Sequence, residues 1–159
     1  MFTAFGLIFL YLSAILPTGR IALLFLSSIF VAGLLVEDQP GLAILSFIMV
    51  GGLGLLLVPN LLMVLPYVLL FGHYGIGKYY FEKIRDKVVS FVLKLLYFNV
   101  GLVAIYFLAG EIFFGQLLKT VPLWLLVVLA QIAFVIFDFL YSRVVLLYEH
   151  TIRPKLLRG

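Results

Sequence analysis

Long apolar runs separated by short polar or proline-containing breaks dominate this chain. The breaks "PTGR", "EDQPG" and "VPN" end the first three runs, and the segments "KYYFEKIRDK" and "EIFFGQLLKT" separate the last three. In hydrocarbon the backbone must satisfy its own hydrogen bonds, so apolar runs of this length predict helices. The pattern predicts an all-α bundle of six membrane spans in a single transmembrane domain, residues 1–159. The expected spans are about 2–16, 21–36, 42–58, 61–76, 88–110 and 121–148.

The composition indicates an integral membrane protein. Hydrophobic residues make up 65% of the chain and charged residues 11%, whereas a soluble domain carries about a quarter charged residues. A chain with so few charges cannot coat a globule of this size in water. No Lys or Arg precedes the first apolar run, and no clear small-x-small cleavage site follows it. We therefore expect a retained span there rather than a signal peptide.

The basic residues predict the orientation of the bundle. The segment after the fourth run, the C-terminal tail and the end of the last span contain most of them: Lys78, Lys83, Arg85, Lys87, Arg143, Arg153, Lys155 and Arg158. With six spans these segments lie on one side, and the other side has only Arg20 and Lys119. The positive-inside rule then places both termini in the cytoplasm. The segment "KYYFEKIRDK" is expected to form a short interfacial helix, either a solvated linker or a docking surface for a partner.

Four polar side chains occupy positions inside the last two spans. Lys94 lies six residues past Val88, or about 9 Å into the membrane, and Asp138 lies at nearly the same depth on the antiparallel span. Asn99 and Gln131 likewise lie at about the same depth on these two spans. Unpaired, such groups are costly in hydrocarbon, so we predict that Lys94 pairs with Asp138 and Asn99 with Gln131. A proton or ion relay is the alternative, although the acid stands alone at its depth.

The chain shows little sign of catalytic chemistry. It has no cysteine, and its two histidines, His73 and His150, are far apart in sequence. The GxxGxG in "GHYGIGKYY" follows no predicted strand, so a dinucleotide site lacks its structural context. Its glycines are expected to allow the end of the fourth span to pack closely or to bend. We expect no enzyme activity, no cofactor and no metal site. Because the basic residues sit at span ends, nucleic acid is not an expected partner.

The outer connections suggest a ligand site. Polar and aromatic residues there could line an outward pocket for a small molecule: Arg20, Asn60, Tyr67, Tyr106, Glu111 and Trp124. The alternative for the aromatic residues is an interfacial belt that anchors the bundle in the lipid bilayer.

The layout resembles a known class of transport proteins. Six short spans, cytoplasmic ends and a basic connection between spans four and five resemble the substrate-binding S components of energy-coupling factor transporters. The stretch "VPNLLMVLPYVLLFGHYGIGKYYFEKIRDK" (58–87) also resembles uncharacterised six-span proteins of Gram-positive bacteria. The resemblance implies a multi-pass protein of the bacterial cytoplasmic membrane.

The same resemblance implies a function. S components bind vitamins or their precursors on the outer side and dock, through small residues, on a membrane coupling subunit driven by two ATPases. The docking residues expected here are Ala4, Ser28 and Ala32, the last two at the spacing small-x-x-x-small. The chain has no Walker motif, so partners would supply the energy. The alternative is a non-transporting membrane scaffold, such as an MreD-like morphogenesis protein.

Overall fold

The computed structural model describes residues 1–16 and 18–152, with side chains at 112–114, 116–118, 151 and 152 outside the description. It is built from helices, and the described residues contain no strand. The main helices are α1 (Phe2–Ile15), α2 (Arg20–Val36), α3 (Pro40–Leu57), α4 (Gly72–Glu82), α5 (Lys87–Thr120) and α6 (Leu123–Leu147). The shorter turns are the 3-10 helix η1 (Leu61–Met63) and the π-helical η2 (Tyr67–Phe71) and η3 (Tyr148–Ile152).

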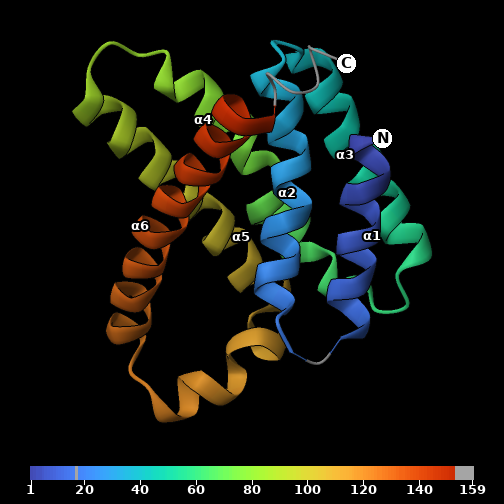
Figure 1. The fold of residues 1–159 in the computed structure, drawn as a ribbon. Helices are drawn as coiled ribbons and strands as arrows, with labels where there is room; N and C mark the ends of the chain where they lie inside the picture. Colours follow the sequence, from blue (N-terminus) through green and yellow to red (C-terminus); the bar gives the residue numbers. More distant parts are fainter. Residues whose placement is uncertain (17, 153–159) are drawn as a thin grey trace.

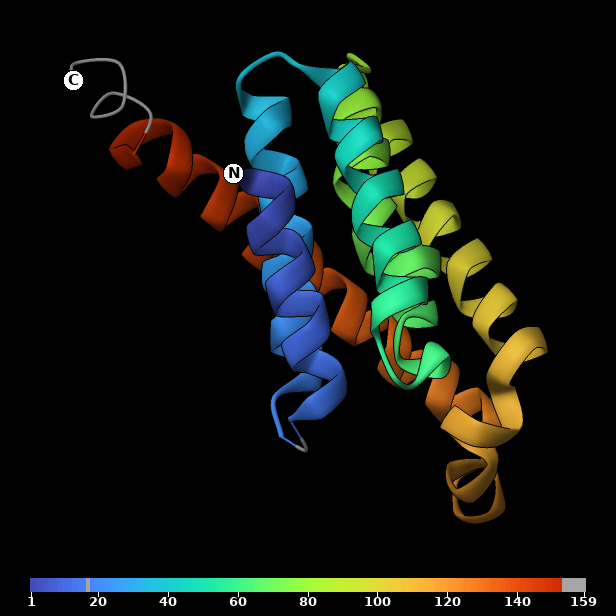
Figure 2. The same ribbon diagram turned by 90° about the vertical axis from the view of Figure 1, so that its right-hand side faces the viewer.

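Consecutive helices run in alternating directions (Figure 1). The N-terminus, the connections at 37–39 and 83–86, and the end of α6 lie at one end of the bundle, which we call the upper end from its place in Figures 1 and 2. The connections between α1 and α2, α3 and η1, and α5 and α6 lie toward the lower end. The charged segment after α4 and the end of α6 therefore share one end, as the sequence pattern requires.

Among the described residues, four helical segments are long and apolar enough to cross a membrane, which indicates a membrane protein. They cover residues 40–57, 61–81, 87–111 and 123–150. The first two helices are apolar but shorter, with 14 and 17 residues. Their lengths correspond to about 21 and 26 Å, against a hydrocarbon core of about 30 Å.

The structure differs from the expected spans in two places. The fourth helix does not stop at residue 76, because α4 continues to Glu82. The separate interfacial helix expected at 78–87 is therefore wrong: its first half extends α4, and its last residue, Lys87, begins α5. The fifth helix runs past Gly110 to Thr120, with non-helical backbone angles at Ala109.

Small residues allow the helices to approach one another closely. On α1 and α2, the buried Ser27 hydroxyl donates to the Gly6 carbonyl at 2.7 Å. In α4, Gly72, Gly75 and Gly77 each face an aromatic ring, and an added Cβ atom would lie within 2.8 Å of a ring atom or its hydroxyl. The glycines of "GHYGIGKYY" therefore serve the close packing that the sequence predicted.

Candidate functional site

A buried charge cluster joins three helices near the upper end of the bundle. It contains Lys78 of α4, Lys94 of α5 and Asp138 of α6. Lys94 Nζ donates to Asp138 Oδ2 at 2.9 Å, and Lys78 Nζ donates to Oδ1 of the same carboxylate. The two lysines are only 3% and 7% exposed, so neither ammonium is free to exchange this partner for water.

Neighbouring polar groups complete the coordination of this cluster. The Tyr74 hydroxyl donates to Asp138 Oδ1 at 2.6 Å, and Lys78 Nζ donates to Ser142 Oγ at 2.7 Å. Glu82 Oε1 lies 3.2 Å from Lys78 Nζ and 3.3 Å from Lys94 Nζ. Two ammonium groups thus face two carboxylates, and the cluster is formally neutral. Such full pairing is what makes buried charges tolerable, because an unpaired charge in a low dielectric costs several kcal/mol.

An amide pair connects α5 and α6 further toward the lower end. Asn99 Nδ2 donates to Gln131 Oε1 at 3.2 Å, and Gln131 Nε2 donates to Asn99 Oδ1 at 2.9 Å. The buried ring of Phe134 lies between the amide pair and the charge cluster along α6, and it packs on Phe98 with centroids 4.7 Å apart. The structure therefore contains both pairs expected from matched depth on the two helices.

Beyond the amide pair, α5 and α6 diverge and leave a pocket of about 310 Å³. Asn99 and Gln131 form its polar part, and Tyr106 contributes a further hydroxyl-bearing ring. The remaining lining is aliphatic or aromatic: Leu102, Val103, Phe107, Leu123, Leu126, Val127 and Ala130. Mostly apolar walls with a few polar groups are typical of small-molecule sites. We call this space the α5–α6 pocket.

The six residues expected to bind a ligand do not line a common pocket. Tyr106 lines the α5–α6 pocket, and the exposed Trp124 follows Leu123 of its wall. Arg20 is exposed and donates from Nε to the Leu16 carbonyl at 3.1 Å.

The other three lie elsewhere. Asn60 accepts a hydrogen bond from the Leu62 amide and so caps η1. Tyr67 is fully buried in a core cluster with Leu10 and Val64. Glu111 is exposed where the kinked α5 continues below Ala109. Residue 17, which belongs to the expected rim, lies outside the described residues.

The residues expected to dock on a partner are divided between the surface and the core. Ala4 of α1 is exposed. Ser28 and Ala32 of α2 are 0% and 3% exposed, and Tyr141 of α6 packs in the same core cluster as Ala32. In this conformation those two small residues accommodate an aromatic ring of the same chain and are not open to a partner helix.

Sequence reasoning missed Lys78, Tyr74 and Glu82 as members of the charge cluster. It assigned Lys78 and Glu82 to a separate interfacial helix, either a solvated linker or a docking surface. A usable signal was present in the spacing, since Tyr74, Lys78 and Glu82 are each four residues apart and share one helix face if the helix continues. Ser142 follows Asp138 at the same spacing on α6.

The chain matches no known family model, no curated protein and no solved structure. The class that the fold and the site define is therefore the coarse one: an all-helical membrane protein whose α4, α5 and α6 are joined by buried polar groups, over the residues that the structure describes.

Proposed function

We propose that the protein is a solute-binding subunit of the membrane, similar to the S components, and that its ligand occupies the α5–α6 pocket. The observation that carries the proposal is the pocket itself, which presents two amide groups and a tyrosine within otherwise apolar walls. The volume of about 310 Å³ lies at the lower limit for small-molecule sites. These walls favour a largely apolar compound with one or two hydrogen-bonding groups, as in many vitamin-like molecules.

The proposed topology determines on which side of the membrane this pocket lies. In a six-span bundle with both termini in the cytoplasm of a bacterial cell, the upper end is cytoplasmic and the α5–α6 pocket belongs to the outer half. The two short helices α1 and α2 then cross a locally thinner layer or lie partly behind their neighbours. Uptake of the ligand would require a coupling subunit and ATPases as partners, since the chain contains no Walker motif.

Binding can be tested with the protein's single tryptophan. Trp124 lies beside the pocket wall, so its emission should change when a ligand enters. We would titrate the purified protein with a panel of vitamins and precursors, following Trp124 fluorescence and the melting temperature. A ligand that binds only the folded state raises stability by RT ln(1 + [L]/Kd).

Adjacent valines provide a matched control. Val127 lines the pocket and Val128 does not, although both are about half exposed (49% and 46%). Val127→Phe should weaken binding of the responsive compound at least tenfold, and Val128→Phe should leave it within twofold. Equal effects of the two variants would place the ligand elsewhere. Absence of any responsive compound would favour the scaffold function instead.

A further inference from the structure

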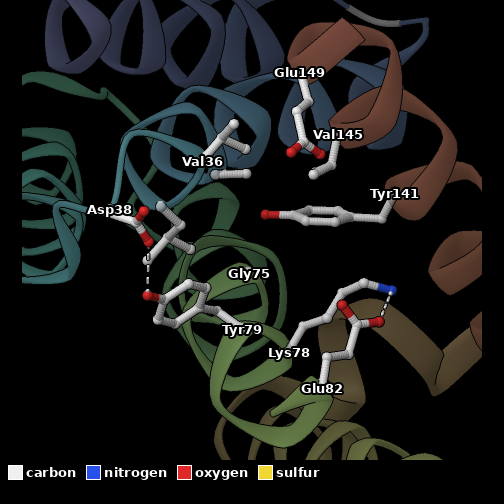
Figure 3. A pocket seen from close by; sticks show the side chains of 11 residues that line it. Val36, Asp38, Gly75, Lys78, Tyr79, Glu82, Tyr141, Val145 and Glu149 are labelled. Atoms are coloured by element: carbon white, nitrogen blue, oxygen red, sulfur yellow. Dashed lines mark hydrogen bonds and ion pairs between the residues drawn. The ribbon is translucent and has the colours of Figure 1, made fainter.

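A second pocket of about 250 Å³ opens at the upper end of the bundle, between the end of α2, the middle of α4 and the end of α6. Figure 3 shows its walls, with Asp38, Glu82 and Glu149 around it and the Tyr141 hydroxyl pointing toward its centre. Small residues, Ala32 and Gly75, form part of its floor. We call this space the upper pocket. It shares no lining residue with the α5–α6 pocket.

The charges around the upper pocket favour a cation. Three carboxylates line it, from a connection, from α4 and from η3, against one ammonium, that of Lys78. Lys78 is already held by Asp138 and Ser142 in the charge cluster. Glu82 is held by the cluster lysines, whereas Asp38 accepts a long hydrogen bond of 3.4 Å from Tyr79 and interacts electrostatically with the exposed Lys83. Glu149 has no hydrogen bond or ion pair within the part of the chain that the structure describes.

The aromatic walls supply the second element of cation recognition. The ring of Tyr79 already accepts an ammonium group, since Lys83 Nζ lies 3.9 Å from the ring centroid. Tyr141 reaches the pocket only because position 75 is glycine, where a Cβ atom would lie 2.0 Å from the Tyr141 hydroxyl oxygen. Aromatic faces combined with carboxylates are the usual surroundings of alkylammonium groups.

From these contacts we infer that the upper pocket binds a small alkylammonium ion, with Asp38 and Glu149 as counter-charges and Tyr79 and Tyr141 as walls. A metal ion is not the expected occupant, because the described residues hold no group of three or more His, Cys, Asp or Glu that could ligate one. The inference does not depend on the proposed ligand of the α5–α6 pocket. With the topology proposed above, the site faces the cytoplasm.

The test uses the full chain in lipid nanodiscs and three probes: choline, ethanolamine and putrescine. The matched neutral compound is 3,3-dimethylbutan-1-ol, which has the shape of choline without its charge. At least one of the three cations should raise the melting temperature in a saturable manner, and the neutral compound should not. Equal shifts from choline and its neutral analogue, or no shift from any of the three cations, would overturn the inference.

Two variants locate the site. Glu149→Gln should raise the Kd of the responsive cation at least tenfold. Asp86→Asn removes the same charge at the same end of the bundle, away from the pocket, where Asp86 caps α5 through the Val88 amide at 2.8 Å. Asparagine caps a helix about as well as aspartate, so this variant should bind the cation within twofold of the wild type. If both variants weaken binding equally, general surface charge is responsible and the upper pocket is not the site.

Discussion

Lys94 Nζ on α5 lies 2.9 Å from Asp138 Oδ2 on α6, within the apolar part of both helices. Either side chain alone would place an unpaired charge in the apolar part of the bundle, which is energetically costly. Together with Lys78 and Glu82 they form a formally neutral, hydrogen-bonded set that joins three helices. The cluster therefore acts first as a structural connection, and it borders the upper pocket through Lys78 and Glu82.

Removing Asp138 should be more harmful than removing either lysine. Asp138→Asn leaves two buried ammonium groups with only the half-exposed Glu82 as counter-charge, and we expect a loss of about 3 kcal/mol in the free energy of unfolding. Lys94→Met should cost about 1.5 kcal/mol, because Asp138 keeps its hydrogen bonds from Lys78 and Tyr74. Reversible unfolding in mixed micelles gives both values.

The double variant decides whether the two residues interact. If they do, its loss should be smaller than the sum of the single losses by at least about 1 kcal/mol. Lys119→Met, at an exposed position near the other end of the bundle, is the control and should change stability little. Strict additivity of the two cluster variants would show that the observed contact carries no coupling.

The hydrogen bonds between Asn99 and Gln131 should make the effects of substituting these two residues depend on each other. Asn99→Leu leaves the Gln131 amide without its partner and should cost about 1 kcal/mol. Replacing both by leucine removes the unpaired group and should recover most of that loss. A double variant that is less stable than either single variant would show that the amides serve another purpose, such as contact with water or a ligand in the α5–α6 pocket.

Replacement by alanine should have opposite effects on stability at two of the glycines. A Cβ atom at Gly101 of α5 would lie 2.3 Å from the Leu69 carbonyl oxygen, a backbone atom that cannot move aside. Gly101→Ala should therefore cost about 2 kcal/mol through overpacking. At Gly52 of α3 the added Cβ atom would meet no side chain or other helix within 4 Å, so Gly52→Ala should be neutral or stabilising by up to about 1 kcal/mol. Thermal unfolding of the two variants side by side checks the packing of α5 on η2.

The sequence predicted the contacts between residues at equal depth on neighbouring spans. It missed the contacts of residues that lie beyond the predicted end of the fourth span, where the helix in fact continues. Helix rise alone places Lys94 level with Asp138 and Asn99 level with Gln131, so these pairs follow from numbering and topology. The fall in hydropathy after Ile76 predicted a separate interfacial helix containing Lys78, yet the fourth helix continues and packs Lys78 against α6. Gly75 permits this approach, because it faces the ring of Tyr141 on α6. Gly72 and Gly77 face rings of other elements, and the sequence does not show which ring each glycine meets.

The pockets could not have been predicted in this way. The α5–α6 pocket lies where the two helices diverge beyond the amide pair, and Tyr141 reaches the upper pocket by packing over Gly75. Both features depend on tilt and side-chain packing, which a one-dimensional pattern does not contain. Tyr67 illustrates the same limit, since its position near the outer start of the fourth apolar run suggested an outer wall and the structure buries it in the core.

Single-cysteine labelling should establish how many helices cross the membrane, because the chain has no native cysteine. With six spans and cytoplasmic termini, Lys119→Cys and Thr18→Cys should react with an impermeant maleimide added to intact cells. Asp86→Cys should react only after permeabilisation. Lys119 and Asp86 lie at opposite ends of α5 and give the orientation, while Thr18 lies between the short helices α1 and α2.

If Lys119→Cys is labelled from outside and Thr18→Cys is labelled only after permeabilisation, the short helices do not cross and the bundle has four spans. Labelling of Asp86→Cys in intact cells would reverse the orientation and place the upper pocket outside.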